Sequence, residues 1–225
     1  MIVGDVGRWA RSFESIEVKL ARTLEGVWPT CLSHLGRRTK VGDELEDPIT
    51  RALVFELRRN KLFPGRVITQ YEILEAGLSG VTAPSRIDFV VAIGDAEDVY
   101  LACECKRLNV SRSSGFTTGA SAYVFDGLSR FAESRYSAGL PIGVMLGYVM
   151  DGRVGAAQTA VQAIIATAHD RLGMIEAHSD MPSPKWRRFR TRHRGSSAGV
   201  IEVRHTLLPL PSRNNAVFFA QQDSE

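Results

Sequence analysis

Apolar residues near the start of the chain recur every three to four positions. They are Trp9, Phe13, Ile16, Leu20, Leu24 and Trp28. This spacing predicts a long amphipathic helix, and Pro29 is expected to end it because proline breaks the helical hydrogen-bond pattern. A second stripe of the same kind predicts a helix over 46–59.

Three apolar runs follow, over 66–74, 86–93 and 99–108. Their composition predicts strands. The short polar segment 94–98 favours a hairpin between the second and third strands, whereas the link 75–85 between the first and second is longer and looser. The polar segment 111–119 predicts a flexible loop.

The second half of the chain alternates between helical and extended patterns. A helical pattern passes through Tyr123, Leu128 and Phe131, and the apolar run 141–150 predicts a fully buried strand. A helix with Val154 and Val161 turned inward comes next, followed by a basic strand and an apolar one before a polar tail. This order predicts one α/β domain with a mixed central sheet flanked by helices on both faces.

Composition narrows the class of protein further. The chain has 225 residues, of which 44% are hydrophobic, and this suits a single domain with a substantial core. We expect no membrane contact, because no apolar run approaches the roughly 20 residues that cross a bilayer, and no signal peptide. Three cysteines without zinc-ligand spacing suggest reduced thiols and a cytoplasmic location. The net charge of +3 is too small to indicate nucleic-acid binding by itself.

Charged residues interrupt two of the predicted strands. Asp88 lies in the second strand, and Glu104 and Lys106 lie two apart in the third, so the latter pair faces one side. The predicted hairpin would bring Asp88 next to Glu104 and Lys106. An isolated Glu–Lys pair of this spacing is usually an exposed cross-strand pair. Here the flanking residues are mostly apolar, and burying unpaired charge is costly, which favours a bound metal or a polar network.

Asp88, the hairpin and Glu104-Cys105-Lys106 resemble the PD-(D/E)XK nuclease superfamily, also called restriction-endonuclease-like. The common core of that family, α-β-β-β-α-β, is similar to the order expected over 46–150, although Ile87 stands where the family name has proline. The resemblance also implies an acid on the first core helix. Glu46 and Glu56 both fit that position, and Glu46 is favoured because it shares a helix face with residues turned toward the sheet.

The resemblance implies a single nuclease-like domain over 1–225, with a restriction-endonuclease-like core. Residues 1–40 would be an N-terminal helical extension, 44–150 the catalytic core, and 151–215 a helix with basic C-terminal strands.

Hydrolysis of a phosphodiester bond suits these residue types. Mg²⁺ or Mn²⁺ prefers carboxylate oxygens, so Asp88 and Glu104 are candidate ligands, and Lys106 would orient a water molecule or neutralise charge on the phosphate. The resemblance adds the backbone carbonyl of Cys105 to the metal ligands. The expected catalytic residues are therefore Asp88, Glu104 and Lys106, assisted by Glu46.

Two further segments are candidates for binding the nucleic acid. Tyr123 and Arg130 lie seven apart, two turns along one helix face, and could both reach the phosphate backbone, or Tyr123 could pack in the core instead. The basic segment 185–195 could follow a phosphate backbone as a strand, or be a solvated edge. Its candidate contact residues are Trp186, Arg188, Arg190, Arg192 and His193.

The sequence therefore predicts a Mg²⁺-dependent nuclease that acts on DNA, with RNA as an open alternative. The resemblance and fold analogy alone suggest defence against foreign DNA or DNA repair. A homodimer or a partner protein would supply specificity. The alternative is a catalytically inactive module that binds nucleic acid or assembles with another protein.

Overall fold

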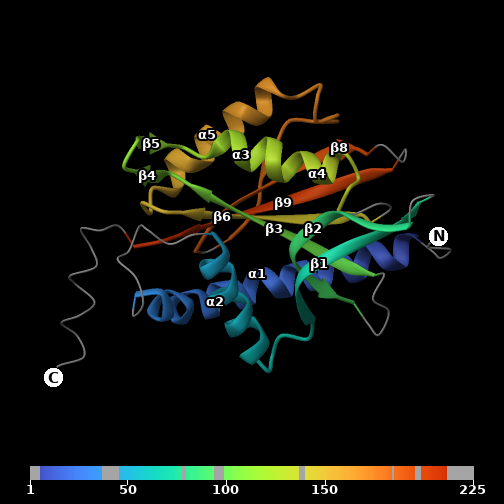
Figure 1. The fold of residues 1–225 in the computed structure, drawn as a ribbon, viewed down its shortest axis with the longest axis horizontal. Coiled ribbons are helices and arrows are strands. Elements are labelled where there is room, and N and C mark those ends of the chain that lie inside the picture. Colours follow the sequence, from blue (N-terminus) through green and yellow to red (C-terminus); the bar gives the residue numbers. More distant parts are fainter. Residues whose placement is uncertain are drawn as a thin grey trace.

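A mixed sheet forms the centre of the molecule (Figure 1). The computed structural model describes residues 6–36, 46–77, 80–93, 99–136, 140–183, 185–195 and 199–211, and seven strands within these residues form the sheet. They are β1 (Arg66–Gly77), β2 (Gly80–Ala92), β3 (Tyr100–Leu108), β6 (Ile142–Val149), β7 (Ser179–Asp180), β8 (Arg187–Arg194) and β9 (Val200–Pro209). Their order is β1-β2-β3-β6-β9-β8-β7. β6 runs parallel to both β3 and β9, and the other neighbours are antiparallel.

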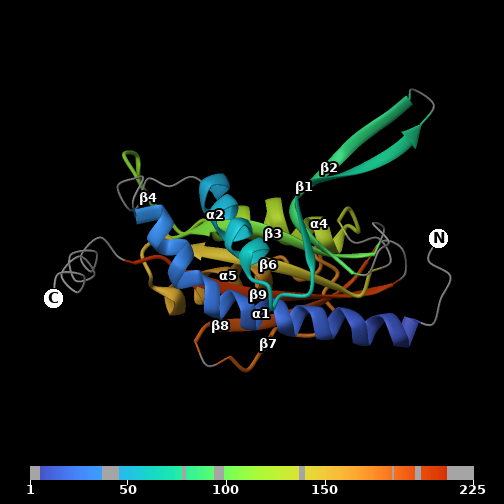
Figure 2. The ribbon, with the colours of Figure 1, turned by 90° about the horizontal axis from the view of Figure 1, so that it is seen from below.

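Helices cover both faces of the sheet, which confirms the predicted α/β architecture (Figures 1 and 2). On one side lie α1 (Val6–Gly36) and α2 (Glu46–Arg59). On the other side lie α5 (Val154–Thr167) and a helical run made of α3 (Ala120–Ala122), the π-helix η1 (Tyr123–Leu128) and α4 (Ser129–Ala132). α2 starts with two acids and ends with two arginines, which is the favourable order for the helix dipole.

α1 continues past Pro29, so the prediction that this residue ends the helix was wrong. Trp28 stacks on Tyr148 with ring centroids 5.9 Å apart, and its indole N–H donates to the carbonyl of Pro209 at 2.8 Å. Cys31, two residues beyond the proline, is fully buried. Burial on both sides of Pro29 outweighs the one helical hydrogen bond that proline removes.

Two segments expected as loops are strands. β1 and β2 pair as far as Gly77 and Gly80, so the expected loose link forms the outer part of a hairpin that projects from the sheet (Figure 2). In place of the expected flexible loop after Val110, β4 (Val110–Arg112) and β5 (Gly115–Thr117) form a two-stranded ribbon. β2 and β3 are antiparallel, as predicted, and the turn expected over 94–98 lies outside the described residues.

The core surrounds β6, which is buried along its whole length, as its apolar run predicted. Cys31, Cys103 and Cys105 are buried and free of disulfides. Among the residues that the structure describes, no helix combines the length and the apolar character needed to cross a bilayer.

Candidate active site

Two carboxylates occupy the place where β2 separates from β3. The backbone pairing of these strands stops just before Asp88. Beyond that point Asp88 Oδ2 accepts a hydrogen bond from the backbone N–H of Cys105 at 2.7 Å, and Glu46 Oε2 accepts one from the N–H of Arg107 at 3.1 Å. Side chains from β2 and from the start of α2 therefore take over the hydrogen bonds that a partner strand would make.

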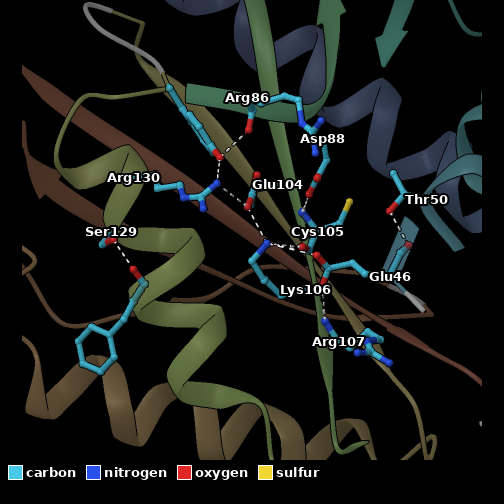
Figure 3. Close-up of polar contacts among 12 residues, drawn as sticks. Glu46, Thr50, Arg86, Asp88, Glu104, Cys105, Lys106, Arg107, Ser129 and Arg130 are labelled. Atoms are coloured by element: carbon cyan, nitrogen blue, oxygen red, sulfur yellow. Dashed lines mark hydrogen bonds and ion pairs between the residues drawn. The ribbon is translucent and has the colours of Figure 1, made fainter. Parts of the chain in front are cut away.

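The ammonium group of Lys106 lies between the carboxylates (Figure 3). Its Nζ donates to Glu104 Oε1 at 2.7 Å, to the carbonyl of Cys105 at 2.9 Å and to Glu46 Oε1 at 3.3 Å. Burial acts to lower the pKa of Lys106, but the carboxylates of Glu104, Glu46 and Asp88 outweigh it and raise the pKa. The side chain is therefore a cation at neutral pH.

Glu104 is the most deeply buried of the three acids, with 1% of its surface exposed. Its Oε1 accepts the hydrogen bond from Lys106 and lies 3.4 Å from Arg130 Nη1. Its Oε2 is also buried, and this oxygen has no hydrogen-bond partner among the described residues. A buried oxygen without a partner is uncommon and costly, and its lone pairs are free to bind a cation.

The electrostatics of the cluster favour an additional positive charge. Burial and, to a lesser extent, the charge of Asp88 raise the pKa of Glu104 to about 7, against the opposing effect of Lys106. Burial likewise raises the pKa values of Asp88 and Glu46 from their ordinary range. Carboxyl groups perturbed by burial and by one another are characteristic of functional sites.

The structure brings together the core residues that the sequence singled out. Asp88, Glu104, Lys106 and Glu46 meet in one cluster, and we call these four residues the carboxylate–lysine cluster (Figure 3). Cys105 contributes backbone groups only, because its thiol points to the opposite side of the strand and accepts a hydrogen bond from the Tyr148 hydroxyl at 3.2 Å.

Glu56, the alternative helix acid, lies outside the carboxylate–lysine cluster. It pairs instead with His34 at 2.9 Å and with Arg59 at 3.6 Å. Glu46 is thus the acid of α2 that contacts β3.

Tyr123 packs in the core, the alternative to a contact with the phosphate backbone, and only Arg130 of the pair reaches the cluster. Arg130 reaches Glu104, whereas Tyr123 is fully buried and hydrogen-bonded to His205 Nδ1 at 3.0 Å. Tyr123 begins the π-helix η1. Both side chains point from the helical run toward the sheet, Tyr123 to β9 and Arg130 to β3.

The candidate arginines of β8 face away from the carboxylate–lysine cluster. Arg188 is buried and bonds to Glu17 of α1 and to Thr206 of β9. Because side chains alternate along a strand, Arg190 and Arg192 face the same side of the sheet as Arg188. Glu104 lies on the other side, against α4. The expected row of arginines therefore does not line this site.

The remaining residues of the basic segment are also distant from the cluster. Arg190 bonds to Ser179, and Arg192 lies 3.4 Å from a carboxylate oxygen of Glu176. His193 is buried and bonded to the carbonyl of Leu172, and burial lowers its pKa. Trp186 is half-buried.

Tyr136 is a member of this site that the sequence did not reveal. Its hydroxyl accepts a hydrogen bond from Arg130 and donates one to the carbonyl of Arg86 at 2.8 Å. The guanidinium of Arg130 also lies over the Tyr136 ring, 5.3 Å from its centroid. Tyr136 thereby fixes Arg130 beside Glu104. It follows α4 at a helix end, and no spacing or motif marks it.

Two cavities adjoin the carboxylate–lysine cluster. One of about 400 Å³ has Asp88, Asp47 and Thr50 in its lining, and the other, of about 420 Å³, has Glu46 and Lys106. Both volumes fall in the range of small-molecule and cofactor sites, about 300–1,000 Å³. Solvent or a substrate can therefore approach the cluster from two directions.

Comparisons of the chain with protein-family models, with curated proteins and with solved structures gave no match. Within the described part of the chain, no three His, Cys, Asp or Glu side chains are already arranged around one metal position. In the carboxylate–lysine cluster, the Lys106 ammonium occupies the space between Glu46 and Glu104.

Proposed function

We propose that this protein is a metal-dependent nuclease with a restriction-endonuclease-like fold that hydrolyses phosphodiester bonds of DNA. The observation that carries the proposal is the buried Glu104 Oε2, which has no partner among the described residues although two other carboxyl groups and a lysine lie beside it. The order of elements from α2 to β6 supports the same fold. By fold analogy, defence against foreign DNA or DNA repair is the setting we propose.

The donor groups of the site fit Mg²⁺ or Mn²⁺. Hard divalent cations prefer carboxylate and carbonyl oxygens, and no imidazole or thiol side chain lies among the groups that contact Lys106. Asp88, Glu104 and the carbonyl of Cys105 would hold the ion. The ion would supply polarisation of the scissile phosphate and acidify a bound water molecule.

Lys106 contributes charge and not proton transfer. Because its pKa is raised, the ammonium stays protonated at neutral pH and stabilises negative charge that develops on the phosphate oxygens. Glu46 holds this ammonium through Oε1 while its Oε2 is fixed by the backbone of β3. Arg130 brings a second cation to the same edge of Glu104.

A catalytically inactive nucleic-acid-binding or assembly module is the second candidate. The observation that favours it is the ion pairing of Lys106 with Glu104 and Glu46, which holds the cluster together without any metal. Among the described residues, no three His, Cys, Asp or Glu side chains are close enough together to bind one metal ion.

Cleavage of DNA distinguishes these functions. Linear and supercoiled DNA would be incubated with Mg²⁺, Mn²⁺ or a chelator. We expect metal-dependent cleavage that falls about 10²-fold or more in Glu104→Gln and in Lys106→Ala. Glu46→Gln should also lose activity, whereas Glu56→Gln, a matched change on the same helix, should retain it.

Two results would contradict the assignment. Equal cleavage by the parent protein and by Glu104→Gln would remove this site from the reaction. Binding of DNA without cleavage under either metal would support the inactive module.

A further inference from the structure

The larger of the two cavities lies between the carboxylate–lysine cluster and the β4–β5 ribbon. Glu46 and Lys106 line one part of it, and the cations Arg107 and Arg112 line another. The remaining wall is rich in hydroxyl groups and includes one aromatic ring. These residues are Ser114, Phe116, Thr117, Thr118 and Ser121. Cations and hydroxyls are the groups that contact phosphate and sugar in nucleic-acid complexes.

The ribbon is exposed, yet its base is firmly attached to β3. The backbone N–H of Asn109 donates to the carbonyl of Thr118 at 2.9 Å, and its buried side chain donates to Asp151 Oδ1 at 3.0 Å. Gly119 has a φ of 69°, and a Cβ there would lie 2.4 Å from the carbonyl oxygen of Arg107. The base of the ribbon therefore passes close to the end of β3, next to the cluster.

Phe116 presents its ring to solvent at the edge of this cavity. It is 54% exposed, and the guanidinium of Arg153 lies over the ring at 5.7 Å from the centroid. An exposed ring next to cations, beside a candidate phosphodiesterase site, has the features of a platform on which an unpaired base stacks.

We propose that this cavity binds one unpaired nucleotide next to the scissile phosphate. Its base stacks on Phe116, and its phosphate contacts Arg112 and Arg107. The inference rests on the proposed nuclease function and narrows the substrate to DNA strands with an unpaired segment at the cut. A base inside a duplex is stacked on both faces, so it reaches Phe116 only after it leaves the stack.

Binding and cleavage by ribbon variants test this inference. Affinity for a fluorescent single-stranded DNA and for a blunt duplex of the same sequence would be measured with chelator present, and cleavage of both with Mn²⁺. Phe116→Ala should weaken single-strand binding about 5- to 150-fold, from the stacking energy of one base, while Phe116→Trp retains it. Leu62→Ala, at a 92% exposed position outside the site, is the matched control.

The salt dependence of binding tests the phosphate contact. For single strands, log affinity falls with log salt by about 0.7 per phosphate contacted. Arg112→Ala should lower this slope by about that amount. Arg187→Ala, which removes an exposed arginine from β8, should leave it unchanged.

The outcomes separate this inference from the proposed function. Metal-dependent cleavage of blunt duplex as fast as single strands, with Phe116→Ala equal to Leu62→Ala, overturns the inference and leaves the nuclease in place. Single-strand binding that depends on Phe116, without cleavage under any metal, supports the subsite and overturns the nuclease assignment. Tighter binding of RNA than of DNA of the same sequence overturns DNA as the substrate.

Discussion

Replacing Glu17 by alanine removes the carboxylate that two buried arginines share. Glu17 Oε2 accepts a hydrogen bond from Arg204 Nη1 at 2.6 Å, and Oε1 accepts one from Arg188 Nη2. Glu17 is 2% exposed, and both arginines are buried. In the variant, Arg188 keeps its hydrogen bond to Thr206, but Thr206 is neutral. The positive charge of Arg188 therefore stays in the interior without the carboxylate that balanced it.

The structure sets the size of this effect. Loss of one partner of a buried ion pair costs about 3–5 kcal/mol of unfolding free energy. For a chain of 225 residues, each kcal/mol corresponds to about 2–4 °C in Tm, so Glu17→Ala should lower Tm by about 6–20 °C. Glu14 lies 3.5 Å from the same Arg204 but is 63% exposed. Glu14→Ala should therefore cost about 0–1 kcal/mol.

Urea unfolding followed by circular dichroism would give both free energies under one set of conditions. Glu17→Ala and Glu14→Ala differ in burial while they share a helix and a partner, so their difference isolates the effect of burial. A cost for Glu17→Ala within 1 kcal/mol of that for Glu14→Ala would refute the reasoning. It would also reopen a nucleic-acid role for Arg188.

Three other perturbations probe the carboxylate–lysine cluster and its surroundings. Burial is the main cause that raises the pKa of Glu104 from the ordinary value of 4.5 to about 7, so between pH 4.5 and pH 7 the metal-free folded state holds a proton that the unfolded chain releases. Its unfolding free energy should fall as pH rises through that window, and urea titrations at several pH values should show a smaller fall for Glu104→Gln. Tyr148→Phe, which removes hydrogen bonds to Thr50 and Cys105, should lower the unfolding free energy by about 0.5–1.5 kcal/mol in urea. Gly119→Ala should cost about 1–3 kcal/mol and speed hydrogen exchange in the β4–β5 ribbon.

The carboxylate–lysine cluster was predictable because two local rules placed it. Alternation along a strand puts Glu104 and Lys106 on one face, and the hairpin brings β2 beside β3. Apolar neighbours on both strands indicated that these charges are covered. The place of Glu46 in the cluster was predicted because it lies on the helix face that is turned toward the sheet. The Asp88 contact with the backbone of β3 required the strands to separate, and no residue pattern predicts that.

Contacts between distant segments explain what the sequence did not predict. Arg188 is neutralised by Glu17, which lies 171 positions earlier, so no local pattern separates a structural arginine from one that binds phosphate. Tyr123 is hydrogen-bonded to His205, which lies 82 positions later, so no local pattern shows that it packs in the core. Pro29 stays inside α1 because tertiary packing holds the helix on both sides of it.

A crystal soaked in Mn²⁺ and measured at the manganese absorption edge tests the central claim most directly. We predict an anomalous peak at the carboxylate–lysine cluster, about 2.0–2.3 Å from oxygens of Asp88 and Glu104 and from the carbonyl of Cys105. Lys106 Nζ should then no longer contact both Glu104 and Glu46. Saturating Mn²⁺ with no peak there, and with Lys106 still bound to both carboxylates, would contradict the account.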